Sequence, residues 1–73
     1  MIHQNTIYTA GIETEEQVSQ LTERISNMIG VHQVNINIID GQVTVSYETP
    51  ANLNSIEKEI YDEGYKIVFQ GIM

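Results

Sequence analysis

The 73-residue sequence contains no cysteine and no tryptophan, a single proline and only three basic residues, Arg24, Lys58 and Lys66. Without cysteine the chain can form neither a disulfide nor a metal site built on thiolates. No apolar run approaches the roughly 20 residues that cross a bilayer as a helix, and the amino-terminal residues lack the pattern of a signal peptide. We therefore expect one domain over residues 1–73, with its core between about residues 4 and 70, in the cytoplasm.

Ten acidic residues stand against the three basic ones, which gives a net charge of −7 at pH 7. Proteins bind nucleic acid mainly by placing basic side chains against phosphates. The charge balance therefore excludes nucleic acid as a partner and disfavours anionic membrane surfaces. An acidic surface keeps a small domain soluble, and it can also dock onto a basic surface of a partner protein.

The apolar spacing predicts a first helix from Thr14 to Ile29. One face carries the apolar side chains, which are Val18, Leu21, Ile25, Met28 and Ile29. Thr14 and Gln17 form the pattern of a capping box, and the acidic residues 15 and 16 suit the positive end of the helix dipole. Gly30 can end this helix in a left-handed conformation.

A second helix is predicted from its cap at Asn52 to about Glu63, closed by Gly64. Its buried stripe is Leu53, Ile56 and Ile60. Alternating apolar and polar residues predict four strands, which are 4–10, 31–39, 42–48 and 65–70. Asp40–Gly41 has the composition of a two-residue hairpin turn. Ile67 and Phe69 should face inward on the last strand, and residues 71–73 form a tail.

The predicted order is βαββαβ. Right-handed crossovers then give an α+β, ferredoxin-like sandwich, in which a four-stranded antiparallel sheet carries both helices on one face. The apolar faces of the helices and of the sheet form the core between these layers.

Five short segments of the chain occur in the order and at the spacing of one known family. They are Gly11–Ile12, 28–31 (M-I-G-V), 34–37 (V-N-I-N), 43–47 (V-T-V-S-Y) and 56–65 (I-E-K-E-I-Y-D-E-G-Y). Together they resemble the heavy-metal-associated domain of the copper chaperones, over about residues 7 to 68. The resemblance implies the same fold, binding of copper or zinc, and docking onto related domains of metal-transporting ATPases.

The family's metal loop reads G-M-T-C-x-x-C, and its two cysteines hold the metal. This chain has G-I-E-T-E-E-Q, with Thr14 and Gln17 at the cysteine positions and Ile12 at the methionine. A hydroxyl and an amide are hard, neutral donors, whereas Cu(I) prefers soft sulfur. Tyr65 matches a tyrosine found near the metal in bacterial chaperones, and here we interpret it as a packing residue.

Two other sets of side chains could hold a metal ion. Glu13, Glu15 and Glu16 offer oxygen ligands suited to Ca²⁺, Mg²⁺ or Mn²⁺, although neighbouring helix residues point about 100° apart. His3 and His32 could bind Zn²⁺ or Cu²⁺. They should start two strands that are separated by a third, with backbones about 10 Å apart, at the end opposite the metal loop. A charged helix start and two solvent-exposed histidines are the simpler interpretations.

The sequence predicts no enzyme, because it has no cysteine nucleophile and its serines have no histidine nearby. We expect instead a monomeric relative of the copper chaperones without the thiolate site, which docks onto a metal-pump domain or a related chaperone. The docking residues would be Ile12, Glu13, Thr14, Gln17 and Tyr65. One alternative is weak metal binding or transport through ligands other than cysteine. Another is a small-ligand regulatory module of the ACT type, which shares the βαββαβ order and functions as a dimer.

Overall fold

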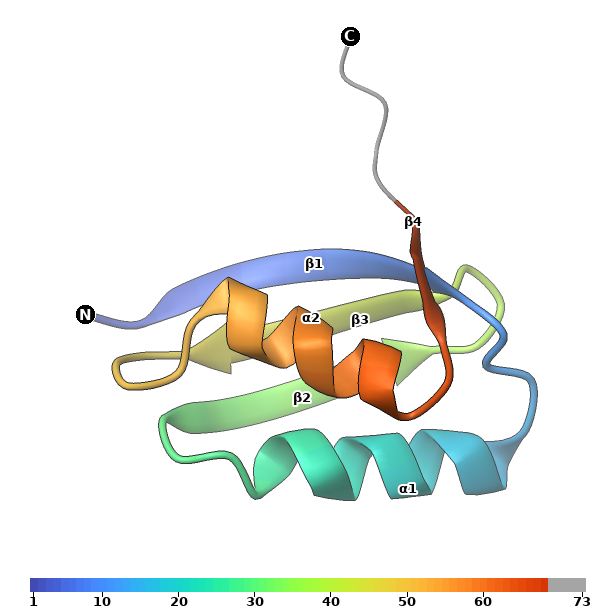
Figure 1. Cartoon of the computed structure of the whole chain (residues 1–73), viewed down its shortest axis with the longest axis horizontal. Helices are drawn as coiled ribbons and strands as arrows, with labels where there is room; N and C mark the ends of the chain where they lie inside the picture. Colours follow the sequence, from blue (N-terminus) through green and yellow to red (C-terminus); the bar gives the residue numbers. More distant parts are fainter. Residues whose placement is uncertain (69–73) are drawn as a thin grey trace, which may run out of the picture.

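The computed structural model describes residues 1–68. It contains β1 (His3–Ala10), α1 (Glu15–Ser26), β2 (Val31–Asn37), β3 (Gln42–Tyr47), α2 (Leu53–Asp62) and β4 (Lys66–Val68). The four strands form one antiparallel sheet in the order β2-β3-β1-β4, and both helices lie on one face of it (Figure 1). The predicted α+β fold is confirmed. The predictions for residues 69 to 73 lie outside the described residues.

The core lies between the sheet and the two helices. Its fully buried side chains come from every layer, and they are Leu21, Ile25, Val43, Val45, Ile56 and Ile60. Val34, Ile36 and Ile67 are half-buried and pack against this cluster. The apolar positions of β2 and β3 face inward, because a sheet covered on one face alternates apolar and polar side chains.

Capping side chains fix where each helix begins. Thr14 caps α1 in a complete capping box with Gln17, and Glu15 and Glu16 occupy the first turn. Asn52 caps α2, and its side-chain oxygen accepts a hydrogen bond from the Ser55 N–H at 2.8 Å. Both starts were predicted from the sequence, since each cap satisfies an N–H group that has no partner within its helix.

The end of α1 was predicted wrongly. The helix stops at Ser26, with Asn27 as its C-cap, rather than at Ile29. Residues 27–30 form a turn in which the Met28 N–H donates to the Ile25 carbonyl. Ile29 consequently points away from the core and is 79% exposed. Its apolar character continued the helical spacing, but the backbone had already left the helix.

The turn between β2 and β3 also differs from the prediction. β2 ends at Asn37, so residues 38–41 form a four-residue connection in place of a two-residue turn. The Asn37 side-chain oxygen accepts hydrogen bonds from the N–H groups of Ile39, at 2.9 Å, and Asp40, at 3.4 Å. An asparagine that bonds to the backbone two residues ahead ends a strand by forming a local turn. Ile39 therefore lies at the tip and is 91% exposed.

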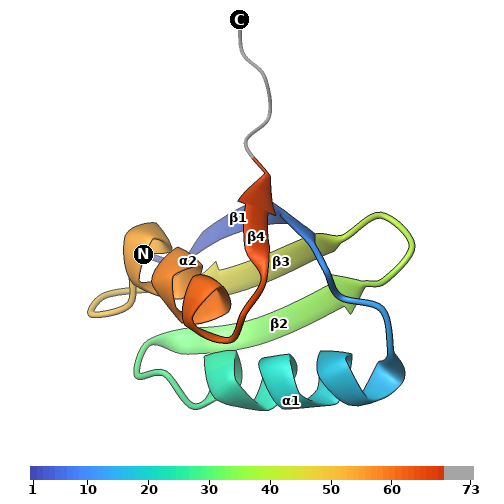
Figure 2. The same cartoon turned by 45° about the vertical axis from the view of Figure 1, so that its right-hand side comes forward.

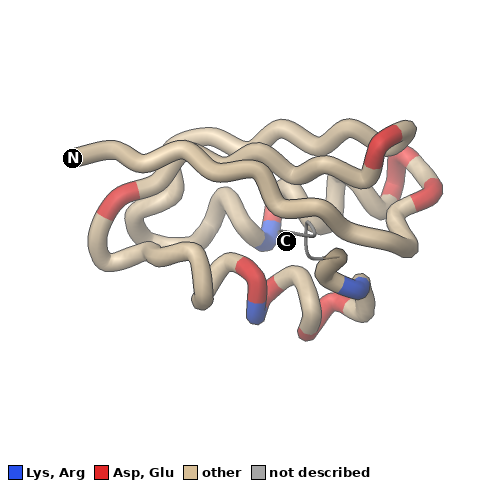
Figure 3. The backbone as a smooth tube through the Cα atoms, turned by 90° about the horizontal axis from the view of Figure 1, so that it is seen from above, with Lys and Arg blue, Asp and Glu red and all other residues tan. Residues whose placement is uncertain are grey.

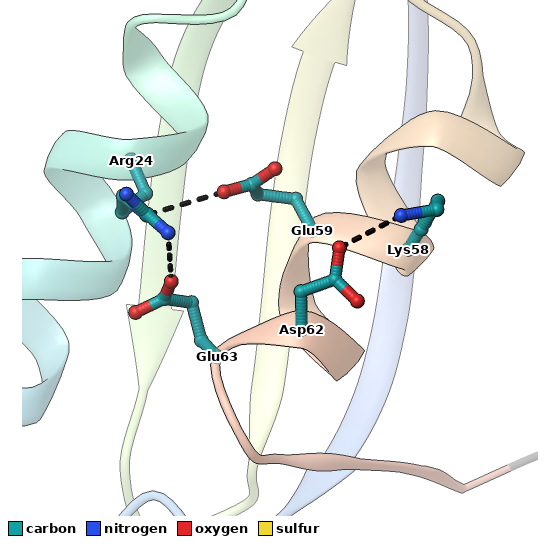
Figure 4. Close-up of polar contacts among 5 residues, drawn as sticks. All are labelled: Arg24, Lys58, Glu59, Asp62 and Glu63. Atoms are coloured by element: carbon teal, nitrogen blue, oxygen red, sulfur yellow. Dashed lines mark hydrogen bonds and ion pairs between the residues drawn. The ribbon is translucent and has the colours of Figure 1, made fainter.

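An ion-pair cluster joins the two helices on the surface (Figure 4). The Arg24 guanidinium of α1 contacts Glu59 at 3.2 Å and also pairs with Glu63 at the end of α2.

Figure 2 shows that β4 runs beside the end of β1 and so lies at the edge of the sheet away from β2. Within residues 1–68, neither helix is long and apolar enough to span a bilayer.

Candidate functional site

The loop at 11–14 connects β1 to α1 and corresponds to the metal loop of the resemblance. It begins at Gly11, whose φ of +110° is a conformation that residues with a side chain rarely adopt. A Cβ atom at this position would lie 3.4 Å from Cδ1 of Tyr65. The half-buried Tyr65 ring therefore packs against the start of the loop and against the core cluster. The packing role predicted for Tyr65 is confirmed.

The donor atoms at the two positions where the family has cysteine, Thr14 and Gln17, already accept hydrogen bonds. The Gln17 side-chain oxygen accepts hydrogen bonds from the N–H groups of Glu13, at 2.7 Å, and Thr14, at 3.0 Å. The Thr14 hydroxyl oxygen accepts one from the Gln17 N–H at 3.1 Å. Both side chains thus fold back onto the loop and satisfy N–H groups that the helix itself leaves without partners.

A Cu(I) ion does not fit this arrangement. The two donors are an amide oxygen and a hydroxyl oxygen, which are hard ligands, and Cu(I) prefers sulfur. An incoming metal would also have to displace three hydrogen bonds that stabilise the helix start. Ile12, which stands in place of the family's methionine, is 6% exposed. It anchors the loop in the core and offers no surface for contact.

The three glutamates around the loop are exposed and point to no common ligand. Glu15 borders a shallow hollow between the start of α1 and the end of β2, whereas Glu13 and Glu16 do not line it. Within residues 1–68 no group of three or more histidine or acidic side chains is arranged to hold a metal ion. Glu15 and Glu16 lie in the first turn of α1, where negative charge suits the helix dipole, which supports the interpretation as a charged helix start.

That hollow has an apolar part that was not predicted from the sequence. The apolar part comes from Val18 on α1, from Ile36 near the end of β2, and from Ile38 and Ile39 in the turn that follows. We name the exposed surface made by loop 11–14, the first turn of α1 and turn 38–41 the loop face. Gly41 holds the turn beside β1, because its carbonyl accepts hydrogen bonds from the Thr9 N–H and hydroxyl at 2.7 and 2.9 Å. The break in alternation at Ile38 and Ile39 was the one signal available in the sequence.

The loop face is also acidic. Figure 3 shows acidic residues at the end of the molecule opposite the amino terminus. They are Glu13, Glu15, Glu16 and Asp40, and all four are exposed. An exposed apolar patch with a charged border is typical of a protein-binding surface.

His3 and His32 are not brought together. They lie on β1 and β2, and β3 runs between these strands, as predicted. The His3 ring lies against Tyr47, with ring centroids 5.7 Å apart. His32 Nε2 lies 2.7 Å from a carboxylate oxygen of Glu48. Each histidine thus has its own partner. Each also lies at the start of its strand, and Figure 1 shows that β1 and β2 begin at the end of the molecule away from the β1–α1 connection.

Comparisons with known proteins agree with the geometry. The family model of the heavy-metal-associated domain matches residues 8–66, which is most of the chain. No curated protein sequence matches. Among solved structures, the CopZ metallochaperone superposes with a TM-score of 0.87 at 25% identity, over 90% of this chain and all of that one. A putative copper-ion-binding protein from Bacillus anthracis str. Ames gives a TM-score of 0.86 at 25% identity, over 93% of this chain and 97% of that one.

More distant structures show the same fold. A copper binding domain from HMA7, a P-type ATPase, superposes with a TM-score of 0.82 at 16% identity, over 90% of this chain and 93% of that one. Each comparison covers at least 90% of this chain, so the fold is shared over nearly all of it. What differs in this chain is the chemistry of the loop, since its sequence contains no cysteine.

Proposed function

We propose, from the premise that this chain belongs to the heavy-metal-associated domain family, that it acts by docking onto a partner protein in metal-ion handling and does not carry metal on thiolates. The observation that carries the proposal is that the donor atoms at the two cysteine positions of the family already accept hydrogen bonds. The Thr14 and Gln17 side chains bond to the loop's own backbone. Their replacement of cysteine therefore gives a well-formed helix start in place of a ligand site.

The loop face supplies the docking surface. It combines the exposed Ile39 and the hollow beside Val18 with a border of four carboxylates. A partner would need an apolar centre and a basic rim, because complementary charges speed association and exclude wrong partners. The solved relatives include a metallochaperone and a domain of a P-type ATPase, and we propose partners of those two kinds. The role is non-catalytic and fits the cytoplasm.

Two spectroscopic experiments test the proposal. In the first, Cu(I) is added anaerobically to ¹⁵N-labelled protein with a competing chelator. We expect no shifts at residues 13–18 or at Tyr65, because the loop has no soft ligand. Specific shifts there at low Cu(I) concentration would show that the family's site survives with unusual ligands, and the proposed loss of metal carriage would be wrong.

In the second experiment the labelled protein is mixed with a heavy-metal-associated domain of a metal-pumping ATPase and, separately, with a copper chaperone. Shifts should gather at residues 11–18 and 38–41. Ile39→Asp should weaken binding about tenfold, as expected for an apolar contact in an interface. Glu15→Lys should weaken it less and should reduce its salt dependence. The charge reversal Glu23→Lys, at an exposed position of α1 beyond its first turn, should leave binding unchanged. Silence of both spectra at millimolar concentration would rule out docking.

A further inference from the structure

A second surface, separate from the loop face, lies between α2 and the edge strand β4. It is an open depression of about 500 Å³, lined by Asn54, Glu57, Lys58, Tyr61, Lys66 and Ile67. We name it the α2–β4 groove. Its surface is mostly apolar, and Tyr61 presents a ring that is 68% exposed. A helix that faces only solvent gains nothing from an exposed aromatic ring beside a half-buried isoleucine. The pair therefore indicates a binding surface.

The groove follows a free edge of the sheet. β4 pairs with β1 on one side and is the last strand in the sheet order, so its other side faces no strand among the described residues. An edge strand presents backbone N–H and C=O groups that an extended segment of another protein can use. The α2 side chains would then meet the side chains of such a segment.

The groove also differs in charge from the rest of the chain. Both lysines of the sequence line it, although the net charge is −7. The remaining basic residue, Arg24, is held on the other side of α2 by Glu59 and Glu63 (Figure 4). Lys58 forms an ion pair with Asp62 at 2.8 Å, while Lys66 forms none within residues 1–68. Among the described residues, Lys66 is therefore a positive charge without an ion-pair partner at the rim of an apolar depression.

We propose that the α2–β4 groove binds an extended, acidic segment of a partner protein. One large apolar side chain of that segment would lie on Tyr61 and Ile67, and its carboxylates would pair with Lys66 and, at the other rim, Lys58. Acidic segments are repelled by the carboxylates of the loop face, so charge directs them to this side of the molecule. The groove shares no residue with the loop face, and the two proposals can fail independently.

The test uses the full-length ¹⁵N-labelled chain and three acetylated, amidated peptides that share a central Phe and Ile. The flanking positions carry Asp and Glu in the first peptide, Asn and Gln in the second, and Lys in the third. We expect the acidic peptide to shift residues 54–61 and 66–68, and to bind more weakly as salt is raised. The neutral peptide should bind about threefold more weakly, and the basic peptide should cause no shifts.

Variants at exposed groove positions assign the contacts without disturbing the core. Tyr61→Ala should weaken the acidic peptide about tenfold, and Lys66→Gln about threefold. Glu57→Gln should strengthen binding of the acidic peptide about threefold, because the substitution removes a carboxylate from the groove. Ile29→Ala shortens another exposed apolar side chain, in the turn that follows α1 and outside both surfaces. It is the control and should change nothing.

Four results would overturn the proposal. Shifts at residues 11–18 would place the peptide on the loop face. Equal binding of the three peptides would show that the groove does not select by charge. If none of the three peptides shifts any signal at millimolar concentration, the groove is not a binding site. Groove shifts that grow with protein concentration alone, together with shifts at 15–18 and 36–39, would mean that the occupant is a second copy of this chain.

Discussion

Thr14 and Gln17 each hold the backbone of the other, at the two positions where the family places its metal-binding cysteines. The Thr14 hydroxyl accepts from the Gln17 N–H at 3.1 Å, and the Gln17 amide oxygen accepts from the Thr14 N–H at 3.0 Å. The same spacing that lets two cysteines share a metal ion lets these two side chains close a capping box. Where the family has two metal ligands, this chain thus has two hydrogen bonds that stabilise the helix start.

The capping box should be measurable as free energy of unfolding. Thr14→Ala should lower it by about 1 kcal/mol, because the substitution leaves the Gln17 N–H to water. For a domain of this size the melting temperature should fall by about 4–8 °C. Thr14→Ser keeps the accepting oxygen and should stay close to the wild type. If Thr14→Ala unfolds at the wild-type urea concentration, the hydrogen bonds contribute nothing to the stability of the domain.

Restoring the two cysteines should restore the metal site. In the Thr14→Cys, Gln17→Cys double variant the thiolates would stand at the N-cap and third residue of α1, on a scaffold that superposes on a metallochaperone over 90% of this chain. We expect Cu(I) affinity to rise by several orders of magnitude over the wild type, measured against a chelator under anaerobic conditions.

The same double variant makes a second, linked prediction. Without metal it should be less stable than the wild type by about 1 kcal/mol, since the capping box is lost. Saturating Cu(I) should more than recover that loss, because a ligand that binds only the folded state stabilises it. A double variant that binds Cu(I) no better than the wild type would show that the loop geometry has changed along with its chemistry.

The sequence predicted the fold and both helix starts because these depend on local signals. Apolar spacing, two N-caps and one polar face on the sheet each point to the same architecture. The errors arose where local hydrogen bonds to the backbone ended a helix or strand before its apolar pattern ended. The Asn37 side chain ended β2 two residues early, although Ile38 and Ile39 continued the apolar run.

Neither binding surface could be predicted in full from the sequence. The loop face needs the turn at 38–41 to lie beside the first turn of α1, and the α2–β4 groove needs Lys66 to lie across from Tyr61. Both are contacts between segments far apart in the chain, and their spacing depends on strand register and sheet order. The loss of the thiolate site, in contrast, followed from the composition alone.

Two glycines with nearly the same backbone conformation should differ sharply in their tolerance of a side chain. Gly30 has φ +99° and Gly64 has φ +103°. A Cβ at Gly30 would lie 2.3 Å from the Glu48 carbonyl oxygen and 2.9 Å from the Ala51 N, whereas one at Gly64 would meet nothing within 4 Å.

Gly64→Ala should therefore cost only the backbone strain, about 1–3 kcal/mol. Gly30→Ala should cost about 2 kcal/mol more, because the hydrogen bond from the Glu48 N–H to the Gly30 carbonyl, 2.8 Å long, must move with the clash. Urea unfolding of the two variants measures the difference. Equal losses would mean that the connection between α1 and β2 moves freely to accommodate the new methyl group.

The Lys58–Asp62 pair on α2 should give a pH-dependent contribution to stability. The hydrogen bond and the charge of Asp62, one turn away, raise the pKa of the Lys58 ammonium above its ordinary value of 10.5. Because the folded-state pKa is the higher of the two, this contribution is fully present below about pH 10 and is lost as the pH rises through the raised pKa.

Asp62→Asn removes the carboxylate and should return the Lys58 pKa toward its ordinary value. NMR titration of the Lys58 side-chain signals in both proteins measures the shift, and Glu57→Gln, which removes a neighbouring carboxylate outside the pair, serves as the control. The two ends of the pair are exposed, so the effect on unfolding should be small and should shrink in high salt. An unchanged Lys58 titration in Asp62→Asn would show that the pair does not persist in solution. Lys58 would then be available, like Lys66, to pair with an acidic segment in the α2–β4 groove.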